Sequence, residues 1–473
     1  MKKLTTLVLA AGLVVSAFAG SASAGEFKPV LQFAEEFSYG DAGYKSQENF
    51  NATTRIRFGF DYVASEDLSA TILFQYGGYS WGTNNDAKFT RDPDADLRMR
   101  LAYIDWTLPN TDVKVRMGRQ AVVAPSYAFG SAVLDGRADA VSVNGNINEN
   151  ISLGFAWMRL DSSSSDKYKN GSLQAPDDDA DALMLNAEFA YDGFKVAPWA
   201  VYAHKQRKAK SGIMPFEHED VKKEIDLSGF TKNGLDPVAD LYIIGASAEL
   251  NMFDPFVFAV DALYSNVTYH NVQDSEYYDD SLDAYYVAAK GSYKFSNGVA
   301  SLGGWYSNGL ELRENHKFDN AFVVLDGGFS ASSVLFDGNV VGGDEFTNVA
   351  NGGLDSPFGT WGLIAEYAGF SFLENLSHTA RILYVEGTSK IDNNSNRSLT
   401  YRTDRTDVFS RSYFLTEDDS AIEIDFDTTY QIYKNLSATL QLGYVFFDQS
   451  NLAAGEEEAD DIFRSALTFV YKF

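Results

Sequence analysis

The sequence predicts an all-β fold, a transmembrane antiparallel up-and-down β-barrel of about eighteen strands, with sixteen as the fallback count. Three observations support this prediction. Segments of alternating apolar and polar residues recur along the whole chain, short connections take turns with long polar ones, and residues 463–473 alternate to the last position. Long extracellular loops and short periplasmic turns are the usual form of such barrels.

The first 24 residues have the pattern of a secretory signal peptide. They begin with two lysines, continue with an apolar run and end on the triplet Ala-Ser-Ala, which supplies small residues for cleavage. The apolar run is shorter than the ~20 residues of a membrane-spanning helix. We therefore expect residues 1–24 to be removed and residues 25–473 to form a single barrel domain.

The composition restricts the function classes. The chain has 38 Lys and Arg against 66 Asp and Glu, a formal net charge of −28, and this acidity argues against a nucleic-acid partner. There is no Cys, so no disulfide contributes to the fold. The 35 Phe and 27 Tyr beside 38 Gly suit a barrel wall with aromatic girdles.

Each predicted strand has one apolar face. In the segment 53–63, Ile56, Phe58 and Phe60 share one face, while Arg55 and Arg57 share the other. A soluble sandwich would turn the apolar face inward, whereas an outer-membrane barrel turns it to lipid. The predicted strands are residues 30–37, 53–63, 68–79, 97–108, 113–119, 137–143, 151–160, 182–191, 194–204, 241–250, 256–265, 284–293, 299–307, 360–369, 376–386, 422–431, 436–447 and 462–473.

The connections favour the barrel over the sandwich. Short turns at 64–67, 109–112, 192–193 and 433–435 alternate with long polar connections, and a sandwich has no reason to sort its loops in this way. The long connections are 81–95, 161–181, 205–240, 266–283, 308–359, 387–421 and 448–461. The ending FRSALTFVYKF resembles the C-terminal strand by which bacterial outer-membrane barrels are recognised for assembly.

Basic residues crowd the predicted inward faces of the early strands. Neighbouring strands would align them as a positive strip beside the path of an ion, because Arg keeps its charge at every accessible pH. The alternative is that some members turn to solvent at the rims or pair with Asp61, Asp96 and Asp105. The predicted lumen-lining basic residues are Arg55, Arg57, Arg98, Arg100, Lys114, Arg116, Arg119 and Arg137.

An acidic strip is predicted late in the chain. In IEIDFDTTY, Glu423, Asp425 and Asp427 alternate with apolar residues, so the three carboxylates share one inward face, and Asp61 is a fourth predicted lumen-lining acid. Set against the basic strip, these carboxylates would create a transverse field that orients polar solutes. The alternative is a solvated inner wall without selectivity.

The stretch 120–135 is unusually apolar for a surface loop. It is preceded by Gly118-Arg119-Gln120 and followed by Arg137-Ala138-Asp139. In these motifs the chain resembles the trimeric general porins, in which the third loop folds into the lumen and narrows it. The stretch departs from the usual porin third loop because it has only one carboxylate. The predicted constriction-loop residues are Gln120, Pro125, Tyr127, Phe129 and Asp135.

The signal, the termini and the strand count are most similar to the homotrimeric porins of sulfate-reducing bacteria. This resemblance implies a porin in the outer membrane of a Gram-negative bacterium, forming a water-filled channel for passive diffusion of small hydrophilic solutes and ions. It also implies a homotrimer in contact with outer-membrane lipid and lipopolysaccharide, without a cofactor and without enzymatic activity.

Two further functions compete with a general diffusion channel. A substrate-specific, sugar-type porin also has eighteen strands, and Trp199 and Trp305 are candidate lumen aromatics for a sugar, although girdle or lipid placement is more common for Trp. An outer-membrane hydrolase is the remote alternative, but no GxSxG elbow is present. Ser377 and His378 are adjacent in a strand, so they point to opposite faces and form no nucleophile–base pair.

The acidic loops and the acidic net charge bear on two expectations, one about metal binding and one about ion selectivity. Clustered carboxylates take Ca²⁺ or Mg²⁺, and solvated charge is the default for the weak candidates Asp177, Asp178, Asp179, Asp279 and Asp280. Loop charges are screened beyond a Debye length of ~8 to 10 Å. The arginine strip should therefore give the channel a weak anion preference, or near neutrality, despite the acidic composition.

Overall fold

The computed structural model describes residues 25–41, 48–81, 97–162, 168–169, 172–173, 179–206, 238–270, 281–309, 311–312, 318–320, 322–336, 356–390, 415–449 and 461–473. The predicted signal segment 1–24 lies outside the described residues. Within the described part of the chain, no helix has the length and apolarity needed to cross a membrane.

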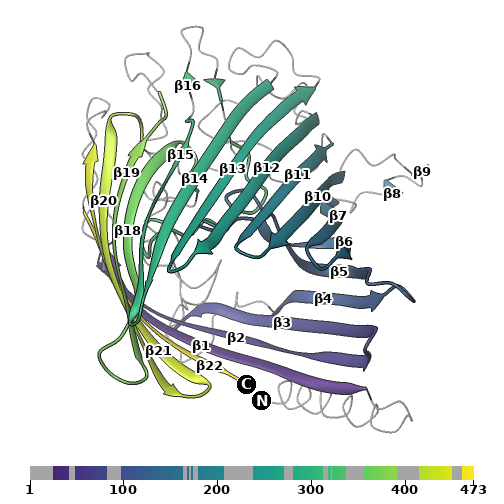
Figure 1. The fold of residues 1–473 in the computed structure, drawn as a ribbon, viewed down its shortest axis with the longest axis horizontal. Helices are drawn as coiled ribbons and strands as arrows, with labels where there is room; N and C mark the ends of the chain where they lie inside the picture. The colour runs from purple at the N-terminus through teal and green to yellow at the C-terminus, as the bar shows by residue number, and fades with distance from the viewer. Residues whose placement is uncertain are drawn as a thin grey trace.

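Eighteen antiparallel strands form one sheet that closes on itself (Figure 1). The first half consists of β1 (Glu26–Asp41), β2 (Glu48–Ser65), β3 (Leu68–Ser80), β4 (Leu97–Thr107), β5 (Lys114–Val123), β6 (Asp135–Asn148), β7 (Ile151–Ser162), β10 (Asp179–Tyr191) and β11 (Phe194–Lys205). The second half consists of β12 (Val238–Phe253), β13 (Phe256–His270), β14 (Ser281–Phe295), β15 (Gly298–Ser307), β18 (Thr360–Phe370), β19 (Leu376–Gly387), β20 (Asp419–Tyr433), β21 (Leu436–Gln449) and β22 (Ile462–Lys472). The predicted barrel of eighteen strands is confirmed.

Strand pairing follows chain order and ends with the closure of the sheet. Each barrel strand pairs with the next one along the chain, and β22 returns to pair with β1. At the seam, the N–H of Phe473 donates to the carbonyl of Leu31 at 2.8 Å. Two small ribbons, β8 (Tyr168–Lys169) with β9 (Ser172–Leu173) and β16 (Glu311–Leu312) with β17 (Phe318–Asp319), lie outside the main sheet.

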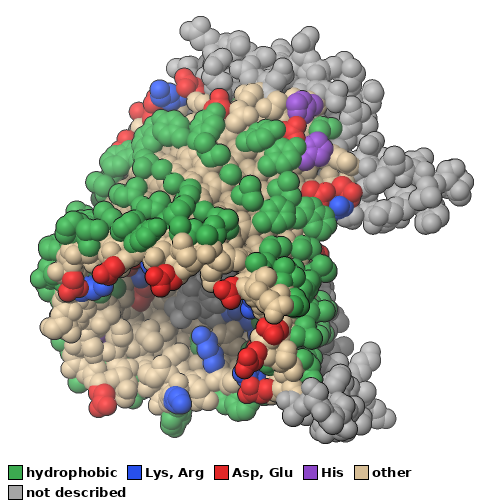
Figure 2. Space-filling view, turned by 45° about the vertical axis from the view of Figure 1, so that its right-hand side comes forward, with side chains coloured by type: hydrophobic (Ala, Val, Ile, Leu, Met, Phe, Trp, Pro, Cys, Tyr) green, Lys and Arg blue, Asp and Glu red, His purple; other side chains and the backbone are tan. Residues whose placement is uncertain are grey.

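The apolar face of the strands forms the outer surface. In β13, Phe258, Val260 and Tyr264 are exposed, whereas the intervening Ala259 and Leu263 are buried inside. Hydrophobic side chains cover much of the outer wall in Figure 2. This is the arrangement that an outer-membrane barrel requires and a soluble sandwich does not show.

Tyrosines mark the edge of the apolar surface nearest the long connections. Several of them point outward and donate hydrogen bonds to carboxylates on the same strand, on the next strand or just before it. Aromatic rings with one polar end suit the level of lipid headgroups. The pairs are Tyr202 with Asp240 at 2.8 Å, Tyr264 with Asp283 at 2.5 Å, Tyr384 with Glu386 at 2.7 Å and Tyr444 with Asp461 at 3.1 Å.

Two connections turn into the lumen and pair with each other. We call residues 124–134, between β5 and β6, the first insert, and residues 322–336, before β18, the second insert. The N–H groups of Leu325, Gly328 and Ser330 donate to carbonyls of the first insert at 3.0, 2.7 and 2.8 Å. The sequence predicted the first insert and not the second, which belongs to the long connection 308–359.

Candidate functional site

A basic wall lines one side of the lumen on β2, β3 and β4. Arg57 donates from Nε to the amide oxygen of Gln75 at 2.8 Å, and Arg100 donates to the same oxygen at 2.8 Å. Arg98 lies opposite Gln75 in the register of β3 and β4. Arg55 is on the same face of β2 as Arg57 but is only 1% exposed, so it is not on the open surface of this wall.

A carboxylate partly neutralises the next part of the wall. Asp105 on β4 accepts two hydrogen bonds from Arg116 on β5, at 2.7 and 2.8 Å, and Lys114 lies 3.3 Å from the same carboxylate. The Arg116 guanidinium also stacks over the Tyr103 ring, 4.0 Å from its centroid. Asp105 is buried beneath these cations, so the exposed charge on this part of the wall is positive.

The predicted acid Asp61 is on the inward face of β2, where Thr71 donates to it at 2.6 Å.

Figure 2 shows a hollow in the molecule with Lys and Arg side chains inside and Asp and Glu side chains around its rim. The positive side chains inside this hollow fit the predicted basic strip, although fewer arginines line it than the sequence predicted.

Arg119 and Arg137 do not line the lumen, and their prediction as lumen-lining residues needs correction. Arg119 lies on the outer face of β5, which it shares with Met117. Arg137 lies on the outer face of β6, which it shares with Val141. Arg119 instead forms an ion pair with Asp139 at 3.8 Å on this outer surface. The sequence contains this information, because both arginines share a strand face with apolar residues that point outward.

The acidic strip lies inside the barrel and anchors the second insert. Glu423 is 0% exposed and accepts hydrogen bonds from the Oγ of Ser332 at 2.7 Å and from the N–H groups of Val334 and Leu335 at 2.8 and 2.9 Å. Asp425, also buried, accepts from the N–H of Ser333 at 3.2 Å. These carboxylates therefore bind the protein's own backbone, and the expectation that they face permeating ions needs correction.

Arg381 on β19 completes this anchor. Its Nη1 lies 2.8 Å from Asp425, 2.7 Å from Asp427 and 3.1 Å from the Ser333 hydroxyl. Its Nε donates to Glu366 on β18 at 2.8 Å. Buried carboxylates require such partners, because an unpaired buried charge is strongly destabilising.

A buried carboxylate on β13 anchors the first insert. Asp261 on β13 accepts from the Ser126 hydroxyl at 2.7 Å and from the N–H groups of Tyr127 and Ala128, both at 2.9 Å. Burial raises the pKa of the Tyr127 hydroxyl to about 12, and Glu188, which accepts from that hydroxyl at 3.2 Å, adds to the rise. The Tyr127 phenol therefore stays protonated and donates to the wall.

The other predicted constriction-loop residues have different positions. Pro125 and Phe129 lie in the first insert, and the Pro125 carbonyl accepts from Ser247 at 2.8 Å. Gln120 belongs to β5, where it is buried and bonded to Ser142 and to the Ala140 carbonyl at 2.7 and 2.9 Å. Asp135 is the first residue of β6.

The two inserts form an apolar body against the wall of β14, β15 and β18. The rings of Phe129 and Phe329 have centroids 5.7 Å apart, and Trp305 lies 5.1 Å from both Phe329 and Phe336. Trp199 and Trp305 point inward but are buried. They do not form an exposed aromatic track for a sugar, so the open part of the lumen lies beside the basic wall.

Four of the five predicted metal candidates, Asp177, Asp178, Asp279 and Asp280, lie outside the described residues. Asp179 is on the outer face of β10 and pairs with Arg159 at 2.6 Å. In the part of the chain that the structure describes, no three His, Asp or Glu side chains are placed to hold a metal ion.

The sequence reading missed Asp261 and Arg381, which hold the inserts in place. Asp261 is the only charged residue in the strand segment FVFAVDALY, and it lies on the inward face of β13. A single charge in an apolar strand is a sequence signal that indicates a buried anchoring residue. Arg381 is similarly isolated in LSHTARILYV. A lone charge on the inner face of an apolar strand needs a partner from elsewhere in the chain.

Comparison with known proteins shows the fold. Searches with the sequence match no protein-family model and no curated protein. Pseudomonas aeruginosa OccK11 (OpdR) superposes with a TM-score of 0.52 at 12% identity, covering 94% of this chain and 96% of that chain. P. aeruginosa OccK2 (OpdF), in complex with glucuronate, gives a TM-score of 0.51 at 12% identity and covers 95% and 98%. Acinetobacter baumannii OccAB1 gives 0.53 at 10% identity and covers 94% and 97%. The chain therefore has the fold of the outer-membrane porins.

Proposed function

We propose that this chain forms a substrate-selective channel for small hydrophilic anions in the outer membrane of a Gram-negative bacterium. One observation carries the proposal. The two inserts fill one side of the lumen with packed aromatic and aliphatic side chains, and the remaining side is lined by Arg57, Arg98, Arg100 and Arg116. A solute that passes must therefore move along a positive surface.

We prefer a substrate-selective channel to a general diffusion channel. One inserted loop narrows the lumen of a general porin, whereas here two inserts occupy the lumen, and each is held to the wall by a buried carboxylate. The fold neighbours point the same way, since one of them was solved with glucuronate, an anionic sugar derivative. An ion close to the arginines feels their charge with little screening, because the low-dielectric wall concentrates the field.

Ion selectivity in planar bilayers tests the proposal. The wild-type channel in a KCl gradient should give a reversal potential on the anion side, and Arg57→Gln with Arg100→Gln should move it toward cations. The matched control is Arg119→Gln with Arg137→Gln, which removes the same charge from the outer face and should leave the reversal potential unchanged. A cation-selective wild type, or equal shifts in both double variants, would contradict the proposal.

The oligomeric state and the lipid contacts remain proposals. A homotrimer follows from the resemblance to porins, and the native detergent complex should run at three times the monomer mass before heating. The outward band of aromatic residues and carboxylates supports contact with outer-membrane lipid and lipopolysaccharide. The specific likeness to porins of sulfate-reducing bacteria stays a sequence-based prediction.

A further inference from the structure

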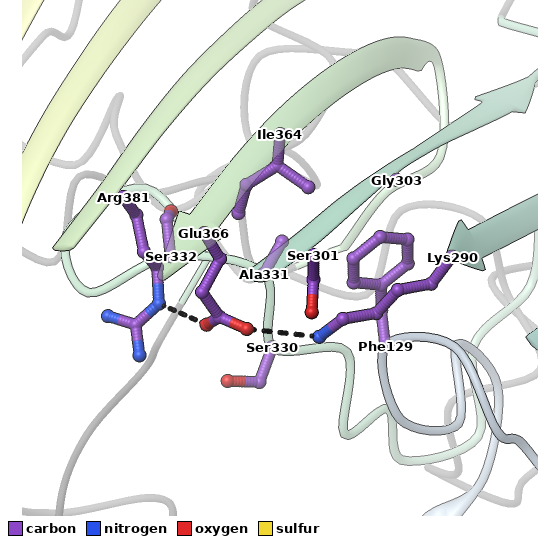
Figure 3. Close-up of a pocket in the computed structure, with 10 residues that line it drawn as sticks. All are labelled: Phe129, Lys290, Ser301, Gly303, Ser330, Ala331, Ser332, Ile364, Glu366 and Arg381. Carbon is purple, nitrogen blue, oxygen red and sulfur yellow. Dashed lines mark hydrogen bonds and ion pairs between the residues drawn. The ribbon is translucent and has the colours of Figure 1, made fainter. Parts of the chain in front are cut away.

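A small polar pocket opens at the edge of the second insert. Its cavity of about 60 Å³ is lined on one side by β14, β15, β18 and β19 and on the other by residues 330–332. Such a volume holds a few water-sized groups, and it is too small for a whole sugar ring. Figure 3 shows its three charged side chains, Lys290, Glu366 and Arg381, in one row.

The charged row presents both donors and acceptors. Glu366 lies between two cations, with Lys290 Nζ at 3.2 Å and Arg381 Nε at 2.8 Å. Among the described residues, Glu366 is the one hydrogen-bond partner of the Lys290 ammonium. The ammonium has three N–H donors, so two of them are available to a group that enters the pocket.

A hydroxyl and an aromatic ring complete the lining. Ser330 is exposed at the pocket, and its hydroxyl has no partner among the described residues, since only its N–H is bonded, to the Phe129 carbonyl. The Phe129 ring lies 5.6 Å from Lys290 Nζ and gives the pocket an apolar side. The Ser301 hydroxyl is bonded to Ser292 at 2.9 Å, so it is less available than that of Ser330.

We propose that this pocket is a docking point for the hydroxyl groups of a polyhydroxylated solute, which deepens the proposed function and rests on it. A hydroxyl both donates and accepts, so it can donate to the Glu366 carboxylate while accepting from the Lys290 ammonium. A simple carboxylate fits less well, because the Glu366 charge would repel it. The pocket would hold one or two hydroxyls while the rest of the solute stays in the lumen.

Current block by a neutral polyol tests the proposal. Sorbitol is added to the purified channel in planar bilayers, with poly(ethylene glycol) of equal viscosity as the control that lacks adjacent hydroxyls. Sorbitol should reduce the current more than viscosity accounts for. Ser330→Ala and Lys290→Met should each raise the half-blocking concentration about fivefold, the effect of one net hydrogen bond. The control Ser437→Ala changes the second residue of β21, which does not line the pocket, and should leave the half-blocking concentration unchanged.

A second measurement separates this inference from the proposed function. Saturation-transfer NMR on the detergent-solubilised protein detects sorbitol binding whether or not the protein conducts. Transfer that is present in the wild type and reduced in Ser330→Ala supports the pocket even if the bilayer currents fail, which would refute only the channel. Equal block by sorbitol and poly(ethylene glycol), no saturation transfer, or identical behaviour of the two variants and the wild type would overturn the inference. Block by gluconate without block by sorbitol would overturn it as well, because it would assign binding to the basic wall.

Discussion

Replacing Glu423 by Gln should release the second insert from the wall. The change keeps the size of the side chain but replaces by an NH₂ group one of the two carboxyl oxygens, which together accept hydrogen bonds from Ser332, Val334 and Leu335. The amide has one accepting oxygen, and its NH₂ end faces N–H donors that it cannot satisfy. At least one backbone N–H is then left buried without a partner.

The size of the effect follows from these contacts. A buried donor that loses its partner costs about 1 to 3 kcal/mol. With one backbone N–H left unpaired, we expect a local loss of about 2 kcal/mol or more. Since 1.4 kcal/mol is a factor of ten, opening of the insert should become at least about 30-fold more frequent.

Two measurements detect this opening. Hydrogen exchange of the peptides covering residues 322–336 should accelerate by that factor, and the single-channel conductance should increase because the insert vacates part of the lumen. Glu374→Gln is the matched control, since Glu374 is exposed in the turn between β18 and β19. Unchanged exchange and unchanged conductance in Glu423→Gln would refute the role of this carboxylate as an anchor.

Asp261→Asn should accelerate exchange in residues 126–128 and leave residues 332–335 protected, and simultaneous loosening of both regions would show that the inserts are not separately anchored. Asp105→Asn should strengthen the anion preference, because it frees the charges of Arg116 and Lys114; a reversal potential that moves toward cations would contradict this account. Phe336→Ala should destabilise the barrel by about 3 to 5 kcal/mol through a cavity in the apolar body, seen as a lower temperature for the heat-induced gel shift. Phe372→Ala, at an exposed turn position, should leave that temperature unchanged.

The strands were predictable because their alternation is local. In β13 or β20, the polarity of the adjacent residues indicates which face of the sheet a residue lies on. This period of two is readable even where the strand ends are assigned wrongly. β1 is longer than predicted because its pairing with β2 extends from Glu26 opposite Val63 to Asp41 opposite Glu48. Those end residues have no alternation of their own, so only the partner strand reveals them.

The second insert was not predictable in the same way. Its stretch FVVLDGGFSASSVLF is as apolar as the first insert, but it lies inside a long polar connection and pairs with residues almost 200 positions earlier. The function of Glu423 and Asp425 depends on that pairing. Alternation alone places both carboxylates inside the barrel without showing whether water or backbone N–H groups meet them.

The seam between β1 and β22 has a consequence for how the protein is made. Until β22 arrives, β1 and the most recently added strand both present unpaired N–H and C=O groups, and such edges readily pair with the wrong chain. A sheet with fewer strands in this register still has two unpaired edges, because the second neighbour of β1 is β22. Both edges of the sheet therefore need protection until β22 pairs with β1, and sealing of this seam is the event that ends their exposure.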